Sequence, residues 1–143
     1  RTTGELSSLI ANAMPAAARR EKQHPAKRVF QAIRIAVNDE LGQITSVLEN
    51  IIPCMAPGGR IAIITFHSLE DRIVKNFFFE GAHPETVLDK RIPLRVEELP
   101  QPYWYDLQRI KPDERECETN PRSRSAVMRV ATRSARTWSE VRL

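Results

Sequence analysis

The stretch PGGRIAIITFHSLEDR, residues 57–72, decides the fold class of this chain. Gly58-Gly59 marks a turn, and residues 60–66 form a short, nearly continuous apolar run rich in β-branched side chains. Such a run is typical of a strand that is buried on both faces, as in a parallel sheet. Ser68 then precedes an acid, Asp71, at the spacing of a helix N-cap and its partner. Turn, buried strand and capped helix in this order predict one repeat of an α/β sheet.

Helical periodicity dominates the sequence before this stretch. Residues 5–14 carry their apolar side chains on one side, which predicts a short helix that ends at Pro15. Between residues 25 and 41 apolar residues recur every four positions, and the pattern resumes after Gly42 to about Ile52. We therefore expect two further helices, with Gly42 as the break between them.

The sequence after about Phe79, where we expect the capped helix to end, changes character. Residues 80–119 contain five prolines and ten acids, so we expect mostly loop, with a strand at residues 105–110. Residues 126–132 predict another strand, which we place near a sheet edge because it carries an internal arginine. The last ten residues have the character of a tail.

Composition and charge set outer limits on function. The chain has 143 residues, 41% of them hydrophobic and 28% charged, as in an ordinary globular domain, and it contains no apolar run that could cross a bilayer. We therefore expect a cytoplasmic protein without a membrane partner. The formal net charge is +4, and residues 119–143 hold six arginines and one glutamate. That excess suits a polyanionic partner. The absence of an initiator Met suggests a partial chain.

The loop at residues 66–72 is the first candidate site. In open α/β sheets ligands bind at the carboxyl ends of strands, and the helix that starts here offers unpaired N–H groups. His67 could exchange a hydrogen bond with a substrate group, and Ser68 and Arg72 are candidate substrate or RNA contacts. The alternative is structural, with a capping serine and a histidine packed under the loop.

A polar stripe on the long helix is the second candidate. Its members lie within about 60° of one another at helical spacing. They are Lys27, Gln31, Arg34 and Asn38. Two cations and two amides without a carboxylate suit phosphate oxygens and base edges. The alternative is an ordinary solvated helix face.

The third candidate is the segment Asn120-Pro121-Arg122-Ser123-Arg124-Ser125. Asn120, Arg122 and Arg124 are the candidate RNA contacts, because arginines between small hydroxyl residues make good phosphate contacts. A solvated turn is the alternative. The aromatic cluster at residues 103–105 could stack on a base, although packing is the favoured interpretation.

Several common motifs are absent. The five glycines form neither a G-x-G-x-x-G loop nor a P-loop, so we expect no cofactor-binding residue in this chain. The two cysteines lack the spacing of metal ligands, and we expect no metal site.

Three blocks of sequence, taken together, resemble one known family. They are residues 24–41, residues 57–75, and residues 120–126 with 129–131. In this order they resemble the ribosomal RNA small subunit methyltransferase H family, also called MraW. The resemblance implies the C-terminal half of a class I (Rossmann-like) methyltransferase sheet, preceded by helices from an inserted helical domain.

The resemblance also implies boundaries within the chain. Residues 1–40 would end the inserted substrate-recognition domain, and residues 41–133 would form the C-terminal part of the methyltransferase domain. Residues 60–66 would be the fifth strand of its sheet, and residues 134–143 a tail.

The activity that the resemblance implies is N4-methylation of a cytidine in 16S ribosomal RNA, with S-adenosylmethionine as donor. His67 and Glu70 would then be the catalytic candidates, because they follow the strand. The family's cofactor-binding segments precede the part matched here, so we expect this chain alone neither to bind the donor nor to methylate RNA. Two alternatives remain: a non-catalytic RNA-binding module, and a structural half-domain that forms a homodimer through an unpaired strand edge.

Overall fold

The computed structural model describes residues 2–15, 24–87 and 101–135. The chain divides into two compact units, residues 1–40 and residues 41–143. Residues 16–23, between the first two expected helices, and nearly all of the expected tail lie outside the described residues. None of the helices in the described ranges combines the length and the hydrophobicity of a membrane span.

Two helices form the described part of the first unit, α1 (Thr3–Ala13) and α3 (Ala26–Asn38). Helix α1 begins with a capping box, in which Thr2 Oγ1 accepts the Glu5 N–H at 3.3 Å and Glu5 Oε2 accepts the Thr2 N–H at 3.1 Å. Ile10 of α1 and Ala26 of α3 are buried. The predicted helix at residues 5–14 is therefore confirmed, with its start at the Thr2 cap.

The break in the long helical pattern falls at Asp39, not at Gly42 as we expected. Asp39 has φ 49° and its N–H donates to the carbonyl of Ile35, which ends α3. Helix α4 (Glu40–Ile51) begins at the next residue and continues through Gly42. Aspartate visits the left-handed region readily enough to end a helix, whereas one glycine inside a helix costs only about 1 kcal/mol.

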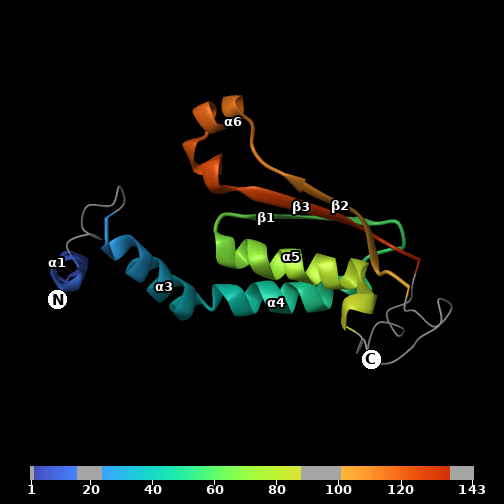
Figure 1. Ribbon diagram of the computed structural model, residues 1–143, viewed down its shortest axis with the longest axis horizontal. Coiled ribbons are helices and arrows are strands. Elements are labelled where there is room, and N and C mark those ends of the chain that lie inside the picture. Colours follow the sequence, from blue (N-terminus) through green and yellow to red (C-terminus); the bar gives the residue numbers. More distant parts are fainter. Residues whose placement is uncertain (1, 16–23, 88–100, 136–143) are drawn as a thin grey trace. The chain divides into compact units, whose positions relative to one another are not determined.

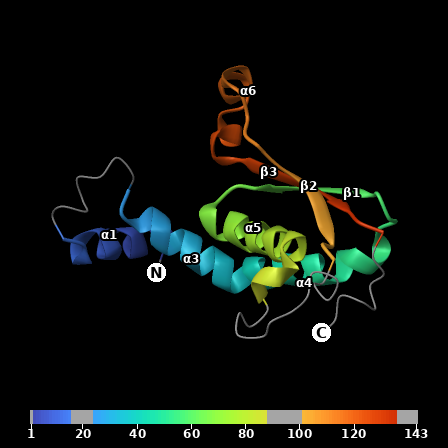
Figure 2. The same ribbon diagram turned by 45° about the vertical axis from the view of Figure 1, so that its right-hand side comes forward.

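A three-stranded sheet organises the second unit (Figure 1). Its strands are β1 (Arg60–Thr65), β2 (Trp104–Ile110) and β3 (Val127–Arg133), in the order β1-β3-β2. Figures 1 and 2 show α4 and α5 (Ser68–Ala82) on the same face of this sheet. A short 3-10 turn, η1 (Ile52–Cys54), extends α4, and η2 (Pro84–Val87) follows α5.

The pairing of β1 corrects our prediction of a parallel, doubly buried strand. Both described pairings in the sheet are antiparallel, and β1 occupies one edge. Ile61 and Ile63 pack toward the helices, while Ala62 and Ile64 on the other face are exposed. Only one face of β1 is covered because the described residues supply helices on only one side of the sheet.

Strand β3 is the central strand, which corrects our placement of it at an edge. The internal Arg129 that suggested an edge is instead accommodated on the helix face, where it pairs with Asp71 of α5. Opposite charge on the facing helix lets a central strand carry a cation. The strand predicted at residues 105–110 is confirmed as β2.

The core of the second unit lies between the helices and the sheet. Its buried members come from α4, η1, α5, β2, β3 and the residue before β2, namely Leu48, Ile52, Val74, Phe78, Tyr103, Trp104 and Ala131. Trp104 meets Phe78 edge to face with ring centroids 5.4 Å apart. Packing is thus confirmed for Tyr103 and Trp104, whereas Tyr105 is half exposed.

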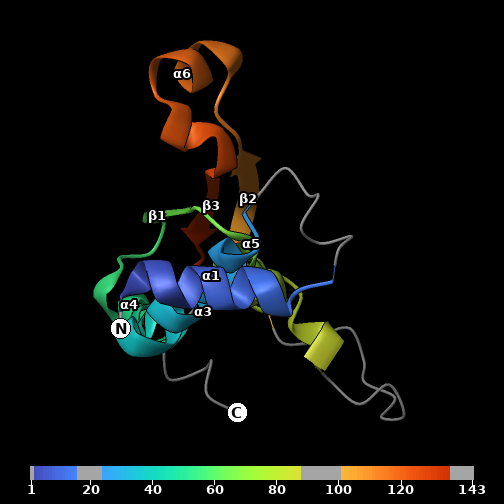
Figure 3. The ribbon, with the colours of Figure 1, turned by 90° about the vertical axis from the view of Figure 1, so that its left-hand side faces the viewer.

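The connection between β2 and β3 stands beyond the end of the sheet in all three ribbon views (Figures 1, 2 and 3). It holds α6 (Glu114–Thr119) and the 3-10 helix η4 (Pro121–Ser125). We expected loop here, and α6 was missed. Asp113 caps it by accepting the Glu116 N–H at 2.7 Å, and acids fill its first turn, both of which favour a helix start.

Candidate functional site at the end of strand β1

The loop after β1 is held by a capping box at the start of α5. His67 is the N-cap: its Nδ1 accepts the Glu70 N–H at 3.4 Å. Glu70 Oε2 reaches back to accept the N–H groups of Phe66 at 2.8 Å and His67 at 3.2 Å. Ser68 is the first helical residue and is exposed, so our assignment of Ser68 as the cap was wrong. A carboxylate three residues after the cap satisfies two otherwise unpaired donors, which favours His67 as the starting point.

His67 and Glu70 form one connected group. His67 Nε2 lies 3.1 Å from Glu70 Oε1, and the two side chains are only 12% and 17% exposed. Because Nδ1 accepts a backbone hydrogen bond, the neutral ring carries its proton on Nε2, next to the carboxylate. The two catalytic candidates are thus brought together at the carboxyl end of β1.

We expected Asp71 to complete the cap. Its side chain instead connects α5 to β3. Arg129 donates to it through two nitrogens, Nε to Oδ1 at 2.7 Å and Nη2 to Oδ2 at 3.0 Å. The hydrogen bonds from Arg129 hold the pKa of Asp71 below its usual value, against a smaller opposing effect of burial. This bidentate pair fixes the first turn of α5 against the central strand.

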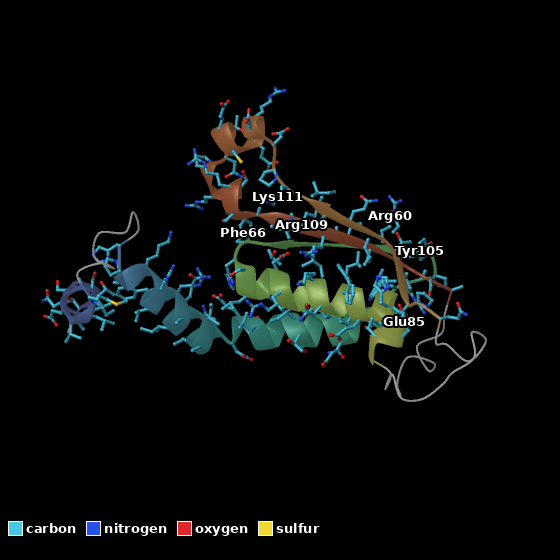
Figure 4. All side chains as sticks on the ribbon, in the orientation of Figure 1. Arg60, Phe66, Glu85, Tyr105, Arg109 and Lys111 are labelled. Carbon is cyan, nitrogen blue, oxygen red and sulfur yellow. The ribbon has the colours of Figure 1, made fainter. Side chains whose placement is uncertain are left out.

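Two further cations approach the same carboxylate. The charges of Arg109 on β2 and Lys75 on α5 also lower the pKa of Asp71. Figure 4 labels Phe66, Arg109 and Lys111 at one end of the sheet, and Arg60 toward the other. Sequence reasoning missed Arg109 and Lys75, because their proximity depends on strand register and on how α5 crosses the sheet. Arg72, the predicted contact on α5, is exposed.

The arginine-rich segment forms η4 in the connection between β2 and β3. Arg122 and Arg124 are exposed, as is Asn120. The Asn120 carbonyl accepts the N–H of Ser123 at 2.9 Å and its Oγ at 2.8 Å, and Ser123 is buried. Ser123 therefore stabilises the turn, and the guanidinium groups of Arg122 and Arg124 lie on its surface.

A carboxylate from α4 lies beside the last two members of the polar stripe of α3. Glu40 accepts from Arg34 at 2.7 and 3.1 Å and from Asn38 at 3.4 Å. The left-handed Asp39 turns the chain so that Glu40 reaches the last turn of α3, which helical spacing alone did not reveal. Lys27 is exposed and Gln31 is partly exposed.

The glycines of this chain do not fit a dinucleotide or S-adenosylmethionine loop. Gly4, Gly42 and Gly81 lie within helices, and Gly58 and Gly59 form the turn before β1. A cofactor loop of that kind follows a strand and opens a helix, so that the backbone can approach the ligand. Within the described residues, the glycines therefore supply no such cradle.

Three antiparallel strands with two helices on one face agree with part of an α/β methyltransferase fold. Residues 1–134 match the model of the MraW methylase family, and the chain belongs to that family.

Curated relatives carry the name ribosomal RNA small subunit methyltransferase H. The relative from Bordetella petrii is 48% identical over 134 residues, which cover 94% of this chain and 36% of the relative. Those from Paenibacillus sp. and Halothermothrix orenii are 49% and 45% identical, covering 91% and 93% of this chain and 41% and 43% of the relatives. The chain thus spans well under half the length of these relatives.

Proposed function

We propose that this chain is the C-terminal part of an enzyme that methylates the N4 amino group of a cytidine in 16S ribosomal RNA. The observation that carries the proposal is the family match over residues 1–134, together with curated relatives named for methyl transfer to small-subunit ribosomal RNA. Residues 1–40 would close a helical substrate-recognition domain, and residues 41–133 would belong to the methyltransferase domain. The division of the chain between Glu40 and Leu41 supports this boundary.

The chemistry of the acceptor explains what the site has to provide. The lone pair of a cytosine N4 amino group is delocalised into the ring, so the group is a weak nucleophile. The base must leave its stack and be held with N4 aligned on the methyl group, and alignment of this kind can supply much of the rate enhancement. Polar side chains at the end of a strand are well suited to fix such a flipped base.

His67 and Glu70 are the side chains that we propose for this task. Glu70 Oε2 is engaged by the backbone N–H groups of Phe66 and His67, which fixes the carboxylate in place. Its Oε1 would accept a hydrogen bond from the amino group and receive its proton late in the reaction, while the Nε2–H of His67 would donate a hydrogen bond to the base. Because the cap immobilises both groups, they would need little reorganisation when the substrate binds.

S-adenosylmethionine, which the family implies, would supply the methyl group. Since the glycines of this chain form no cradle for it, the donor would be held by residues in the additional length that the relatives possess. The part played by the present residues is then to position the acceptor and to manage its proton.

The remaining candidates would contact the RNA outside the reacting base. In the second unit, phosphates and sugars would be contacted by Arg122 and Arg124 on η4, by its N-cap Asn120, and by Arg72 and Ser68 on α5. On α3, Lys27 and Gln31 are better placed for this role than Arg34 and Asn38, which Glu40 already engages. Such contacts set the register of the RNA without reading its sequence.

Tritium transfer tests the proposal. A protein that contains this chain and the further length of its relatives is incubated with tritiated S-adenosylmethionine and small ribosomal subunits lacking the modification. We expect tritium in 16S RNA. An unlabelled RNA, with a protein shown to be folded, would contradict the proposed activity.

A pair of variants at His67 separates catalysis from capping in that longer protein. Asparagine is a good N-cap but has no imidazole, whereas alanine removes both functions. If His67 acts on the substrate, His67→Asn lowers kcat about 100-fold while the thermal midpoint is retained. If His67→Asn keeps full activity and only His67→Ala loses stability, the residue is a cap alone.

A further inference from the structure

Like charges face one another across strands β2 and β3 near the end of the sheet. Arg109 and Arg129 are register partners in this antiparallel pair, so their side chains project from the same face. Directly opposed like charges destabilise a strand pair. Arg129 is anchored by Asp71, while Arg109 has no ion-pair partner among the described residues.

Helix α5 adds a third cation to this face. Lys75 follows Asp71 by four residues on α5 and therefore lies on the same side of the helix. Its charge, like those of Arg129 and Arg109, lowers the pKa of the Asp71 carboxyl. Lys75 is exposed and has no ion pair within the described ranges.

The charges of this cluster do not balance. Arg129, Arg109 and Lys75 are three cations, and Asp71 is the one acid that they share. Lys111, the residue directly after β2, lies at the same end of the sheet as Arg109 (Figure 4). An excess of positive charge beside a fixed bidentate pair is complementary to an anion that comes from outside the chain.

We propose that Lys75 and Arg109, oriented by the Arg129–Asp71 pair, bind a phosphate of the RNA backbone. This inference rests on the proposed function, which supplies RNA as the partner. It adds a contact surface on the face of β2 that is turned toward α5, where Arg109 and Lys75 are exposed. Arg109 offers a planar fork to the phosphate oxygens, and Lys75 a point charge. The contact would hold RNA beside the loop that carries His67 without reading sequence.

The test uses this chain and a fluorescently labelled 12-nucleotide oligouridylate. Binding is followed by anisotropy from 0.05 to 0.3 M NaCl, a range over which the Debye length falls from about 14 Å to about 6 Å. Each phosphate contact to a single strand contributes about 0.7 to the slope of log affinity against log salt. We expect Arg109→Gln and Lys75→Gln each to lower that slope by about 0.7 and to weaken binding about fivefold at 0.1 M.

Two further variants make the result specific. Arg60→Gln removes the same charge from an exposed arginine toward the other end of the sheet, and should leave the slope unchanged. Arg109→Lys keeps the charge and should retain the slope. Equal losses from Arg60→Gln and Arg109→Gln, or no binding by the unaltered chain, would overturn the inference.

The methyl-transfer assay is independent of this one. If Arg109→Gln and Lys75→Gln leave RNA binding unchanged while the longer protein transfers methyl groups, the phosphate site is rejected and the proposed activity is not. Loss of methyl transfer, with the expected salt slopes, would reject the proposed activity and leave the phosphate site standing.

Discussion

At the scale of single residues, the contact between Gly81 and Trp104 shows how local chemistry sets the core. A Cβ added at Gly81 would overlap Trp104 Cδ1. The Gly81 carbonyl also accepts the Tyr103 N–H at 2.7 Å. A side chain at this position is therefore excluded while the indole stays in place.

Replacing Gly81 tests this packing. We expect Gly81→Ala to lower the free energy of unfolding by about 2 kcal/mol, because the methyl group must displace a buried indole. Chemical denaturation followed by tryptophan fluorescence measures it. Gly42→Ala is the matched control: Gly42 is exposed within α4, so alanine should stabilise the chain by up to about 1 kcal/mol. Equal effects of the two changes would contradict the proposed role of Gly81.

Residue-level details were also the hardest to predict from sequence. Asp39 ends α3 and His67 caps α5, whereas Gly42 and Ser68 were the residues that general preferences favoured. Asp39 ends the helix because aspartate adopts the left-handed conformation readily, and His67 is the cap because Glu70 reaches back to its N–H group. Preferences of single residues do not contain that information.

At the scale of elements, the Arg129–Asp71 pair joins helix α5 to strand β3. Its two partners are 58 positions apart in the sequence and are 15% and 21% exposed. Because the folded-state pKa of Asp71 is depressed, the pair stabilises the fold above the usual pKa of an aspartate, near 4. That stabilisation is lost as pH falls from about 4 through the depressed pKa.

The variant Asp71→Asn should show this dependence. From pH 5 to pH 8 we expect it to lose a constant amount of stability, about 2 kcal/mol, since a charged hydrogen bond is removed. Below pH 4 the difference from the unaltered chain should shrink. Denaturation at a series of pH values measures both. A difference that stays constant down to pH 2 would show that the carboxylate charge is not responsible.

The elements themselves followed from local patterns, but their pairing did not. The apolar run at β1 and the periodicity of α5 predicted a strand and a helix at the right places. The antiparallel partner of β1 and the central position of β3 depend on contacts between residues more than sixty positions apart. Interpreting β1 as doubly buried assumed a covered second face, which the described residues do not supply.

At the scale of the whole molecule, the two edges of the sheet differ in kind. The β2 edge carries an irregularity between Tyr105 and Gln108, and Asp106 there has φ 52°. Bulges and charges of this sort discourage further pairing. The β1 edge is regular and mostly apolar after Arg60. Its Ile64 side chain is 57% exposed. We therefore expect β1 to be the edge that receives another strand.

That strand would come from the additional length of the relatives, or from a second copy when this chain is alone. We therefore infer that the chain forms one side of a methyltransferase sheet that continues past β1. Hydrogen exchange of the β1 amides that point away from β3 tests it most directly, with this chain at low concentration compared with the longer protein. We predict that these amides exchange at nearly unprotected rates in this chain and at least about 1,000-fold more slowly in the longer protein. Equal exchange rates in the two proteins would mean that no strand pairs with β1 in the longer protein.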